Sequence, residues 1–330
     1  DHRGDTVNAQ YEMSGAGSDV RFWDVSDPFE IQEVEGFSID GGRAIRVMGD
    51  TIMQFIAFDG SAYHPVEIIG EVENQDLHGM LPPDFLIVTH PLFIDQAHQL
   101  ADHHRSFDGM TVEVVTLQQI YNEYSSGIQD VGAIRDFARM LYQKGSPGST
   151  LAYMLMFGDA SYDYLDRLPE NTNYMPTFQS RESLQHASSF VTDDFFGEFD
   201  ESEGSNAAGT VDIGIGRFPV QTVQQAQDAV DKTIHYSAMK TDVMGAWRNR
   251  ICFIADDGDI NIHLKQPEDL ADIVAASQPV YNISKIYLDA YKQISTPSGD
   301  RYPEVNDAID KTVRDGALIV NYTGHGGELG

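Results

Sequence analysis

The stretch ALIVNYTGHGG, residues 317–327, decides the expected fold more than any other part of the chain. Its first six residues, 317–322, are apolar or carry an amide, as in a strand buried inside a sheet. The glycines that follow predict a tight turn, because glycine bends where other residues are strained. The turn presents His325, whose imidazole can transfer protons near neutral pH. A lone histidine of this kind more often only packs, so its meaning depends on the surrounding sequence.

Outward from this strand, apolar strand patterns alternate with helical patterns from residue 84 onward. This alternation is typical of a mainly parallel sheet covered by helices, an α/β fold. Strands are predicted at residues 85–89, 111–116, 151–157, 251–255, 283–288 and 317–322. Helices are predicted at residues 95–105, 131–144, 223–239, 267–277 and 303–315. Residues 158–222 form a long acidic loop, and loops of this length usually serve function.

Residues 1–79 have a different pattern, with short alternating runs separated by turn clusters such as Asp40-Gly41-Gly42. Such runs predict a β-rich segment, part of a sandwich. Residues 73–83 contain few apolar side chains and two prolines, which indicates a linker. The chain therefore divides into a β-rich part and an α/β part.

Composition limits the class of protein. The 330 residues are 41% hydrophobic and carry a formal net charge of −31, which allows large cores but disfavours nucleic acid and anionic lipid as partners. Such a charge suits a secreted or surface protein that avoids nonspecific adhesion, and it is compatible with calcium binding. No run approaches the roughly 20 apolar residues that span a membrane, and the first residues are not a signal peptide. Cys252, the single cysteine, lies in a predicted strand, so we expect a buried, inert thiol and no internal disulfide.

Polar residues follow three of the predicted strands, at the edge where open α/β sheets bind ligands. They are Asp159, the run Asp256-Asp257-Gly258-Asp259, and His325. A carboxylate beside the histidine would fix its tautomer, and backbone N–H groups after it would bind an oxyanion. The alternative is that the aspartates only cap helices.

Motifs of several other enzyme classes are absent from the sequence. It contains no Gly-x-Ser-x-Gly, no phosphate-binding Gly-x-x-x-x-Gly-Lys-Ser/Thr and no His-Glu-x-x-His. In the acidic loop, Asp193, Asp194, Asp200, Glu201 and Glu203 could supply oxygen ligands to calcium. They lack the spacing of an EF-hand, so a solvated acidic loop is an equally good interpretation.

Several segments resemble the gingipain family of caspase-like cysteine peptidases. They are VTDDFFG at 191–197, IGRF at 215–218, TIHY at 233–236 and YTGHG at 322–326. Within the family, the chain is most similar to members that remove C-terminal sorting signals for the type IX secretion system of Bacteroidota. The resemblance covers residues 80–330 and implies a caspase-like fold, with 80–249 as a first subdomain and 250–330 as the start of a catalytic one. Residues 1–79 would be the tail of a preceding domain.

The resemblance implies roles for individual residues. His325 would be the catalytic histidine, and Gly326 would lend its N–H to the oxyanion hole. Asp257 would orient the histidine, with Asp256 as the one-residue alternative. The family's cysteine nucleophile lies on the strand after the histidine, so the sequence is expected to be truncated before it. Cys252 cannot replace it, because it lies within an earlier strand, and these 330 residues alone are expected to be inactive.

The resemblance also bears on substrate and metal. Gingipains that cleave at arginine or lysine hold that side chain with an aspartate, whereas Ile260 stands at or near the matching position. Without that carboxylate, a strict preference for a basic residue is not expected. The predicted substrate-binding residues are Asp159, Asp259 and Ile260. Asp193 and Asp194 are the predicted ligands of a structural calcium, and the chemistry itself requires no cofactor.

The expected function is therefore that of a cysteine endopeptidase that removes C-terminal sorting signals at the outer-membrane surface. It would act by hydrolysis or by sortase-like transfer to a surface glycan, with secreted cargo, other secretion components and lipopolysaccharide as partners. The alternative is a non-catalytic caspase-like scaffold that docks partners of a secretion complex. A metal-dependent hydrolase built on His325 and Asp257 is disfavoured, because two ligands are too few for a closed metal shell.

Overall fold

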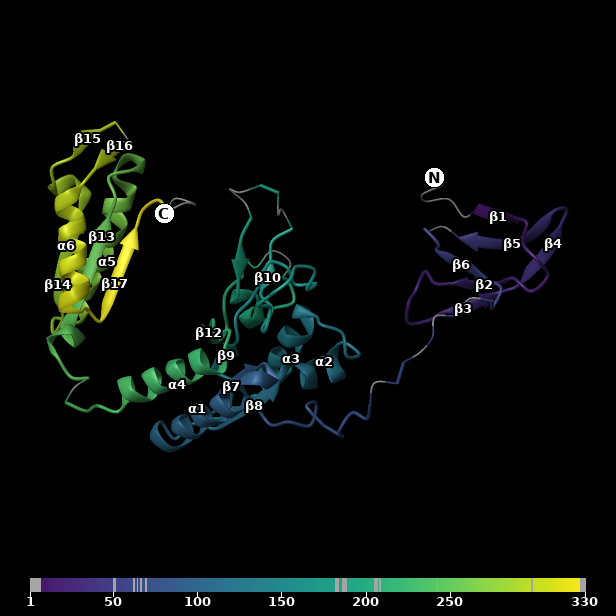
Figure 1. Cartoon of the computed structure of the whole chain (residues 1–330), viewed down its shortest axis with the longest axis horizontal. Helices are drawn as coiled ribbons and strands as arrows, with labels where there is room; N and C mark the ends of the chain where they lie inside the picture. The colour runs from purple at the N-terminus through teal and green to yellow at the C-terminus, as the bar shows by residue number, and fades with distance from the viewer. Residues whose placement is uncertain are drawn as a thin grey trace. The chain divides into compact units, whose positions relative to one another are not determined.

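A computed structural model of the chain describes residues 7–49, 52–61, 63, 65, 67–68, 70–181, 184–185, 189–204, 207, 209–241, 243–297 and 299–326. Tertiary contacts divide the chain into two units, Asp1–Asn74 and Gln75–Gly330, whereas the sequence places this boundary after residue 79. Figure 1 shows the elements of each unit, coloured along the chain.

The first unit is built from antiparallel strands. One sheet has the order β1 (Val7–Ser14), β5 (Gly42–Gly49), β4 (Gly36–Ile39), and the other has the order β3 (Gln32–Val34), β2 (Arg21–Asp24), β6 (Phe55–Phe58). Side chains from both sheets meet in one small core, where Val20, Phe22 and Ile45 are buried. This core explains why alternate residues of these short strands are apolar.

The second unit begins with a parallel sheet covered on both faces. Its strand order is β12 (Gly214–Phe218), β9 (Tyr153–Phe157), β7 (Phe85–Thr89), β8 (Val112–Thr116). Its helices are α1 (Ile94–Phe107), α2 (Leu117–Tyr124), α3 (Val131–Gln143) and α4 (Val223–Ser237). Leu86 and Val88 of β7 pack with α2 and α3, whereas Ile87 between them packs with α1 and α4. Burial on both faces is why this strand reads as an unbroken apolar run.

A separate parallel sheet carries the end of the chain. Its order is β14 (Asn282–Tyr287), β13 (Arg250–Ala255), β17 (Ile319–Thr323), with α5 (Ile262–Ser277) and α6 (Pro303–Asp315) against it (Figure 1). Cys252 and Ile254 pack with α6, whereas Ile251 and Phe253 pack with α5. The predicted α/β class is confirmed. In the described part of the chain, however, the predicted strands form two parallel sheets rather than one.

Short elements complete the second unit. They are the hairpin strands β10 (Phe178–Gln179), β11 (Val191–Thr192), β15 (Ile294–Thr296) and β16 (Gly299–Arg301), and the 3-10 turns η1 (Pro91–Phe93), η2 (Asp194–Gly197), η3 (Ala246–Asn249), η4 (Asp259–Asn261) and η5 (Leu288–Ala290). Among the helices in the described residues, none combines the length and apolarity that crossing a membrane requires.

The Glu123 carboxylate fastens the start of the second unit to α2. Its Oε1 accepts hydrogen bonds from the Leu77 N–H at 2.7 Å and from the Gln75 side chain at 2.8 Å. Its Oε2 accepts from the His78 N–H at 3.1 Å and lies 2.7 Å from His78 Nδ1. Burial alone would raise the pKa of Glu123, but these hydrogen bonds outweigh it and lower the pKa to about 2.

Candidate active site

The neighbouring strands β13 and β17 bring two distant turns to one edge of their sheet. The strands are parallel, and Ala255 at the end of β13 is the register partner of Thr323 at the end of β17. The Asp256 N–H continues this pairing by donating to the Thr323 carbonyl at 3.2 Å. Asp256 and His325 therefore leave the sheet at the same carboxyl edge, where α/β proteins place their sites.

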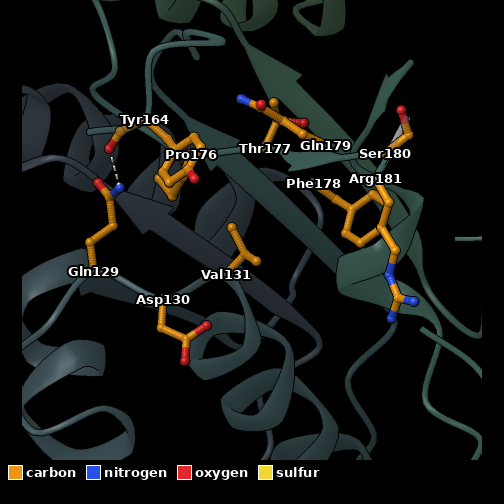
Figure 2. Close-up of a pocket in the computed structure, with 10 residues that line it drawn as sticks. All are labelled: Gln129, Asp130, Val131, Tyr164, Pro176, Thr177, Phe178, Gln179, Ser180 and Arg181. Carbon is orange, nitrogen blue, oxygen red and sulfur yellow. Dashed lines mark hydrogen bonds between the residues drawn. The ribbon is translucent and has the colours of Figure 1, made fainter. Parts of the chain in front are cut away.

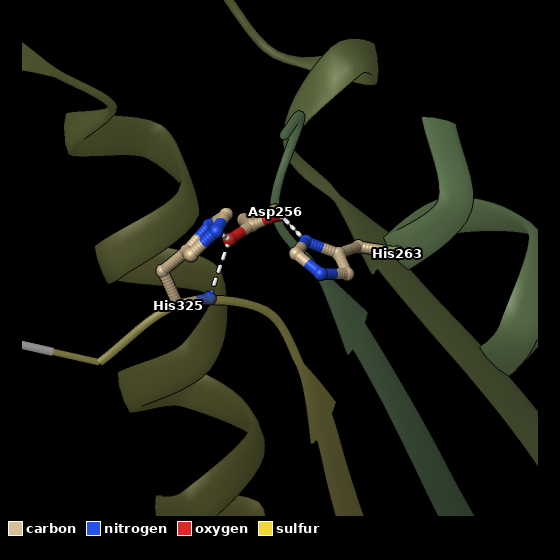
Figure 3. Close-up of side chains that lie close together, drawn as sticks. All are labelled: Asp256, His263 and His325. Carbon is tan, nitrogen blue, oxygen red and sulfur yellow. Dashed lines mark hydrogen bonds and ion pairs between the residues drawn. The ribbon is translucent and has the colours of Figure 1, made fainter. Parts of the chain in front are cut away.

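Asp256 holds His325 through both its backbone and its ring (Figure 3). The Asp256 Oδ2 accepts the His325 backbone N–H at 2.7 Å and lies 3.0 Å from His325 Nδ1. Only 13% of the Asp256 side chain is exposed, whereas 65% of the His325 side chain is. A shielded carboxylate thus orients an imidazole that is largely exposed, the arrangement that a proton-transferring histidine needs.

The acid beside His325 is Asp256 and not Asp257, which corrects the first choice made from the sequence. The Asp257 carboxylate instead accepts a hydrogen bond from the Tyr302 hydroxyl. This hydrogen bond, with burial and nearby acidic groups, raises the pKa of Tyr302 to about 12. Consecutive residues at the end of a strand point to opposite sides, so only one of the two aspartates can face the histidine.

The Asp256 carboxylate stays ionised because its surroundings favour the charge. Burial alone would raise its pKa, but hydrogen bonds outweigh this and hold the pKa well below its usual range. These bonds come from the backbone N–H groups of His325 and Gly258 and from the imidazoles of His263 and His325. An ionised carboxylate only accepts, so the ring nitrogen facing it carries a proton and the Nε2 of His325 is left to accept one.

Two glycines leave room for this pair. A Cβ placed on Gly258 would lie 2.9 Å from His325 Cε1, and one on Gly324 would lie 2.6 Å from Asp256 Oδ2. A side chain at either position would therefore displace the Asp256–His325 pair from this geometry. The turn is further held by the Tyr322 hydroxyl, which donates to the His325 carbonyl at 2.7 Å. Gly326 is exposed, and an added Cβ there would meet nothing within 4 Å.

His263, which the sequence did not single out as a site residue, also contacts Asp256. Its Nδ1 lies 2.6 Å from Asp256 Oδ1, and its ring meets that of His325 edge to face at a centroid distance of 4.8 Å (Figure 3). Only 15% of the His263 side chain is exposed. The signal that could have revealed it is a histidine at the start of a helix that follows the Asp256 turn.

The turn between β13 and α5 contains Ile260 in an unfavourable backbone conformation. Ile260 has φ 56° and ψ 44°, and the next residue, Asn261, has φ 63°. Asparagine tolerates this left-handed region, but a β-branched residue there is strained. The Ile260 side chain is fully exposed to solvent. The backbone of Asp259 belongs to the same turn, while its side chain lies outside the described residues.

Asp159 lies on a different sheet from Asp256 and His325, so the expectation of one shared edge is wrong. It follows β9, and its Oδ2 accepts a hydrogen bond from the Gln221 side chain at 2.6 Å. Its backbone N–H donates to the Val220 carbonyl and its carbonyl accepts from the Met175 N–H. These contacts brace the loops that follow β9 and β12.

The predicted calcium ligand Asp193 is already engaged by an arginine. Its two carboxylate oxygens accept from Arg217 Nε and Nη2, both at 2.7 Å, and the Thr177 hydroxyl adds a third bond at 3.0 Å. The arginine neutralises the charge that calcium would need, so Asp193 does not fit a calcium ligand. The side chain of its neighbour Asp194 is exposed at the start of η2.

Cys252 is fully buried in the middle of β13, as the sequence predicts. It packs with Ile254 and with Val305 of α6. A thiol in this position cannot reach a peptide substrate, so Cys252 is a core residue.

Within the described residues, Asp256, His263 and His325 form the group whose ligand atoms lie close enough to hold a metal ion, all within 4.8 Å of one another. The Asp256 lone pairs are taken by N–H donors, however, and a metal would have to displace imidazole hydrogen bonds from both oxygens. The arrangement therefore fits proton chemistry better than metal binding.

A pocket of about 460 Å³ lies between the start of α3 and β10 (Figure 2). Gln129 at its rim donates to the Tyr164 carbonyl at 2.7 Å, and Asp130 caps α3 by accepting from the Gly132 N–H. The full lining is Gln129, Asp130, Val131, Tyr164, Pro176, Thr177, Phe178, Gln179, Ser180 and Arg181. None of these residues is among the site residues predicted from the sequence.

Comparison with known proteins matches the chain to one peptidase family. The sequence profile of peptidase family C25 matches residues 79–330. Among solved structures, the chain is similar to dimeric latent PorU from Porphyromonas gingivalis, with a TM-score of 0.60 and 33% sequence identity. The match covers 69% of this chain and 23% of PorU, so the chain spans about a quarter of that protein's length. No curated protein sequence matches it.

Proposed function

The chain belongs to the gingipain family, peptidase family C25, and we propose that it carries the histidine and the acid of a cysteine endopeptidase. His325 is the proton-transferring residue, and Asp256 fixes its orientation. The observation that carries this proposal is the double contact from Asp256 Oδ2 to the backbone and the ring of His325. Because Nδ1 faces the carboxylate, Nε2 is the ring nitrogen that would accept the proton.

The nucleophile in this proposal is a cysteine from polypeptide outside these 330 residues. Two observations support that choice: Cys252 is buried in β13, and the chain spans 23% of PorU. On this view the 330 residues alone do not turn over a peptide. The pairing of Asp256 with His325 favours a working site over a purely scaffolding domain, because a scaffold gains nothing from an oriented imidazole.

The reaction would proceed through a thioester. The thiolate attacks the scissile carbonyl carbon, and the Gly326 N–H would stabilise the oxyanion. The C–N bond breaks as the His325 imidazolium delivers its proton to the leaving amine. Water, or an amine on a surface glycan, then attacks the thioester, gives its proton to His325 and releases the thiolate. Hydrolysis and transfer differ only in this last nucleophile.

The substrates in this proposal are secreted proteins with C-terminal sorting signals, cleaved at the cell surface in a type IX secretion system. The 33% identity to PorU supports this assignment. Asp259 and Ile260 would contact the substrate near the cut. A fully exposed isoleucine favours an apolar or uncharged side chain there over arginine or lysine. Asp159 would act only through the loops after β9 and β12, and Asp193, which is paired with Arg217, would not bind the family's calcium.

The test uses the complete protein that contains this chain and a substrate bearing a C-terminal sorting signal. We expect H325A to lower kcat/KM by about 10³-fold or more, since it removes the proton-transferring group. C252S, the matched control, should cleave as the parent does, and a thiol reagent should block both the parent and C252S. Cleavage by H325A at the parent rate would refute the proposal, as would loss of thiol sensitivity in C252S.

A further inference from the structure

One carboxylate serves two histidines. In the described residues, Asp256 accepts four hydrogen bonds. Its Oδ1 accepts from the Gly258 N–H at 3.0 Å and from His263 Nδ1 at 2.6 Å. Its Oδ2 accepts from the His325 N–H at 2.7 Å and from His325 Nδ1 at 3.0 Å. An ionised carboxylate offers about four lone-pair positions, so this acceptor capacity is filled. Each bond on Oδ1 therefore helps to decide where Oδ2 points.

The contact with His263 is the shorter and more shielded of the two imidazole contacts. His263 Nδ1 lies 2.6 Å from the carboxylate and 15% of the side chain is exposed, against 3.0 Å and 65% for His325. The two rings also touch edge to face at 71°. A half-buried ring that bonds one carboxylate oxygen and packs on the second ring limits the rotation of both Asp256 and His325.

The chain is strained where it delivers His263 to this position. His263 is the second residue of α5. This helix begins directly after Ile260 and Asn261, which both have positive φ. A β-branched residue in this region costs about 1–2 kcal/mol, and such strain persists where the surrounding structure demands it. The fully exposed Ile260 gains no burial in exchange. The sharp turn is what lets the first turn of α5 reach Asp256.

We propose that His263 is a positioning residue for the proton-transferring His325. It donates its Nδ1–H to Asp256 Oδ1 and so locks the carboxylate with Oδ2 facing His325, which keeps His325 in the tautomer with an unprotonated Nε2. This role rests on the proposed function for its catalytic consequence. Its structural consequence, the tautomer of His325, does not depend on any peptidase activity.

The first measurement follows the ring nitrogens of His325 by ¹⁵N NMR in the 330-residue chain, at a pH where the ring is neutral. The informative variants are H263N, whose amide nitrogen takes the place of Nδ1, and H263Q, whose amide nitrogen falls at the place of Nε2. We expect a single tautomer protonated at Nδ1 in the parent and in H263N. In H263Q and H263A we expect a mixture of both tautomers. An unchanged tautomer in H263Q, with the parent's unfolding midpoint, overturns the proposal.

The second measurement is peptide cleavage by the complete protein. H263Q should lower kcat by about 10- to 100-fold with KM within about two-fold of the parent, and H263N should stay within about three-fold of the parent. Equal losses in H263N and H263Q would overturn the positioning role, because only one of them keeps the donor. If H325A cleaves normally, the proposed function fails, and the NMR result alone then decides whether His263 positions the ring.

Discussion

Ala255 and Thr323 are register partners at the ends of two adjacent parallel strands, β13 and β17. This pairing fixes which of the following side chains meet. Because strand residues alternate between faces, a shift of one residue would exchange Asp256 for Asp257 at the histidine. The geometry of the candidate site is thus a direct consequence of the buried pattern of β13, where Cys252 and Ile254 face α6 and Phe253 faces α5.

The two neighbouring aspartates should respond differently to the same substitution. In D256N, an NH2 group replaces one of the two carboxylate oxygens. This group cannot accept hydrogen bonds, so the N–H donors that face it lose their partner. We expect it to lower the free energy of unfolding by about 2–4 kcal/mol and kcat by about 10²-fold or more. D257N, the matched control, can still accept from the Tyr302 hydroxyl and should cost less than about 1 kcal/mol. Urea unfolding and peptide cleavage measure both effects, and equal effects of the two variants would contradict the assignment of Asp256.

Relieving the backbone strain at Ile260 should raise stability and weaken substrate binding. I260G should raise the free energy of unfolding by up to about 1 kcal/mol, because glycine tolerates a φ of 56° and the exposed side chain contributes no burial. If Ile260 contacts the substrate, the same variant should raise KM. N261G is the control, and since asparagine tolerates positive φ, its effect on stability should be smaller. A lower thermal unfolding midpoint for I260G than for N261G would show that the turn is not strained at Ile260.

Because Asp193 is paired with Arg217, the stabilisation that its carboxylate provides should not depend on calcium. Besides Asp193, the Arg217 guanidinium donates to the carbonyls of Gly158, Met175 and Pro176 at 2.8, 2.9 and 3.0 Å. Lysine cannot reproduce this fork, so R217K should lower the free energy of unfolding by about 2–4 kcal/mol. D193N should cost a similar amount, by equal measure in calcium-containing buffer and in EDTA. If D193N lowered the free energy of unfolding only in calcium-containing buffer, Asp193 would have to be a metal ligand after all.

Glu123 should make the second unit sensitive to acid. Its pKa is about 2 in the folded protein against an ordinary 4.5, so its stabilisation is fully present above pH 4.5 and is lost as the pH falls toward 2. The depression corresponds to about 3 kcal/mol at neutral pH. E123Q removes the charge, so the difference in unfolding free energy between parent and E123Q should be largest at neutral pH and shrink below pH 4.5. A difference that stays constant over this range would mean that Glu123 is not held as an ion.

Buried strands were predictable from the sequence because burial on both faces leaves an unbroken apolar run. Helix α2 was missed, although Thr116 and Gln119 form a capping box at its start. The start of α5 was also missed: Pro267 suggests a first helical position, yet it lies inside the helix, which begins at Ile262. In both cases the apolar and proline patterns were given more weight than the signals at the true helix start.

The composition of the site was less predictable than the fold. The turn after β13 indicated an acid beside His325, but choosing Asp256 over Asp257 requires the side of the strand that each residue faces. His263 reaches the site only through the positive φ of Ile260 and Asn261, which an isoleucine gives no reason to expect. The pairing of Asp193 with Arg217 joins residues far apart in the sequence, and no local pattern reports it.

The most direct test of the account is a double-mutant cycle on Asp256 and His325, measured as kcat/KM of the complete protein on a sorting-signal peptide. If Asp256 acts through His325, D256N should cost about 10²-fold or more in the parent but less than about three-fold in the H325A background. Losses that simply multiply, with the D256N effect undiminished in H325A, would contradict the claim that this carboxylate and this imidazole work as one unit.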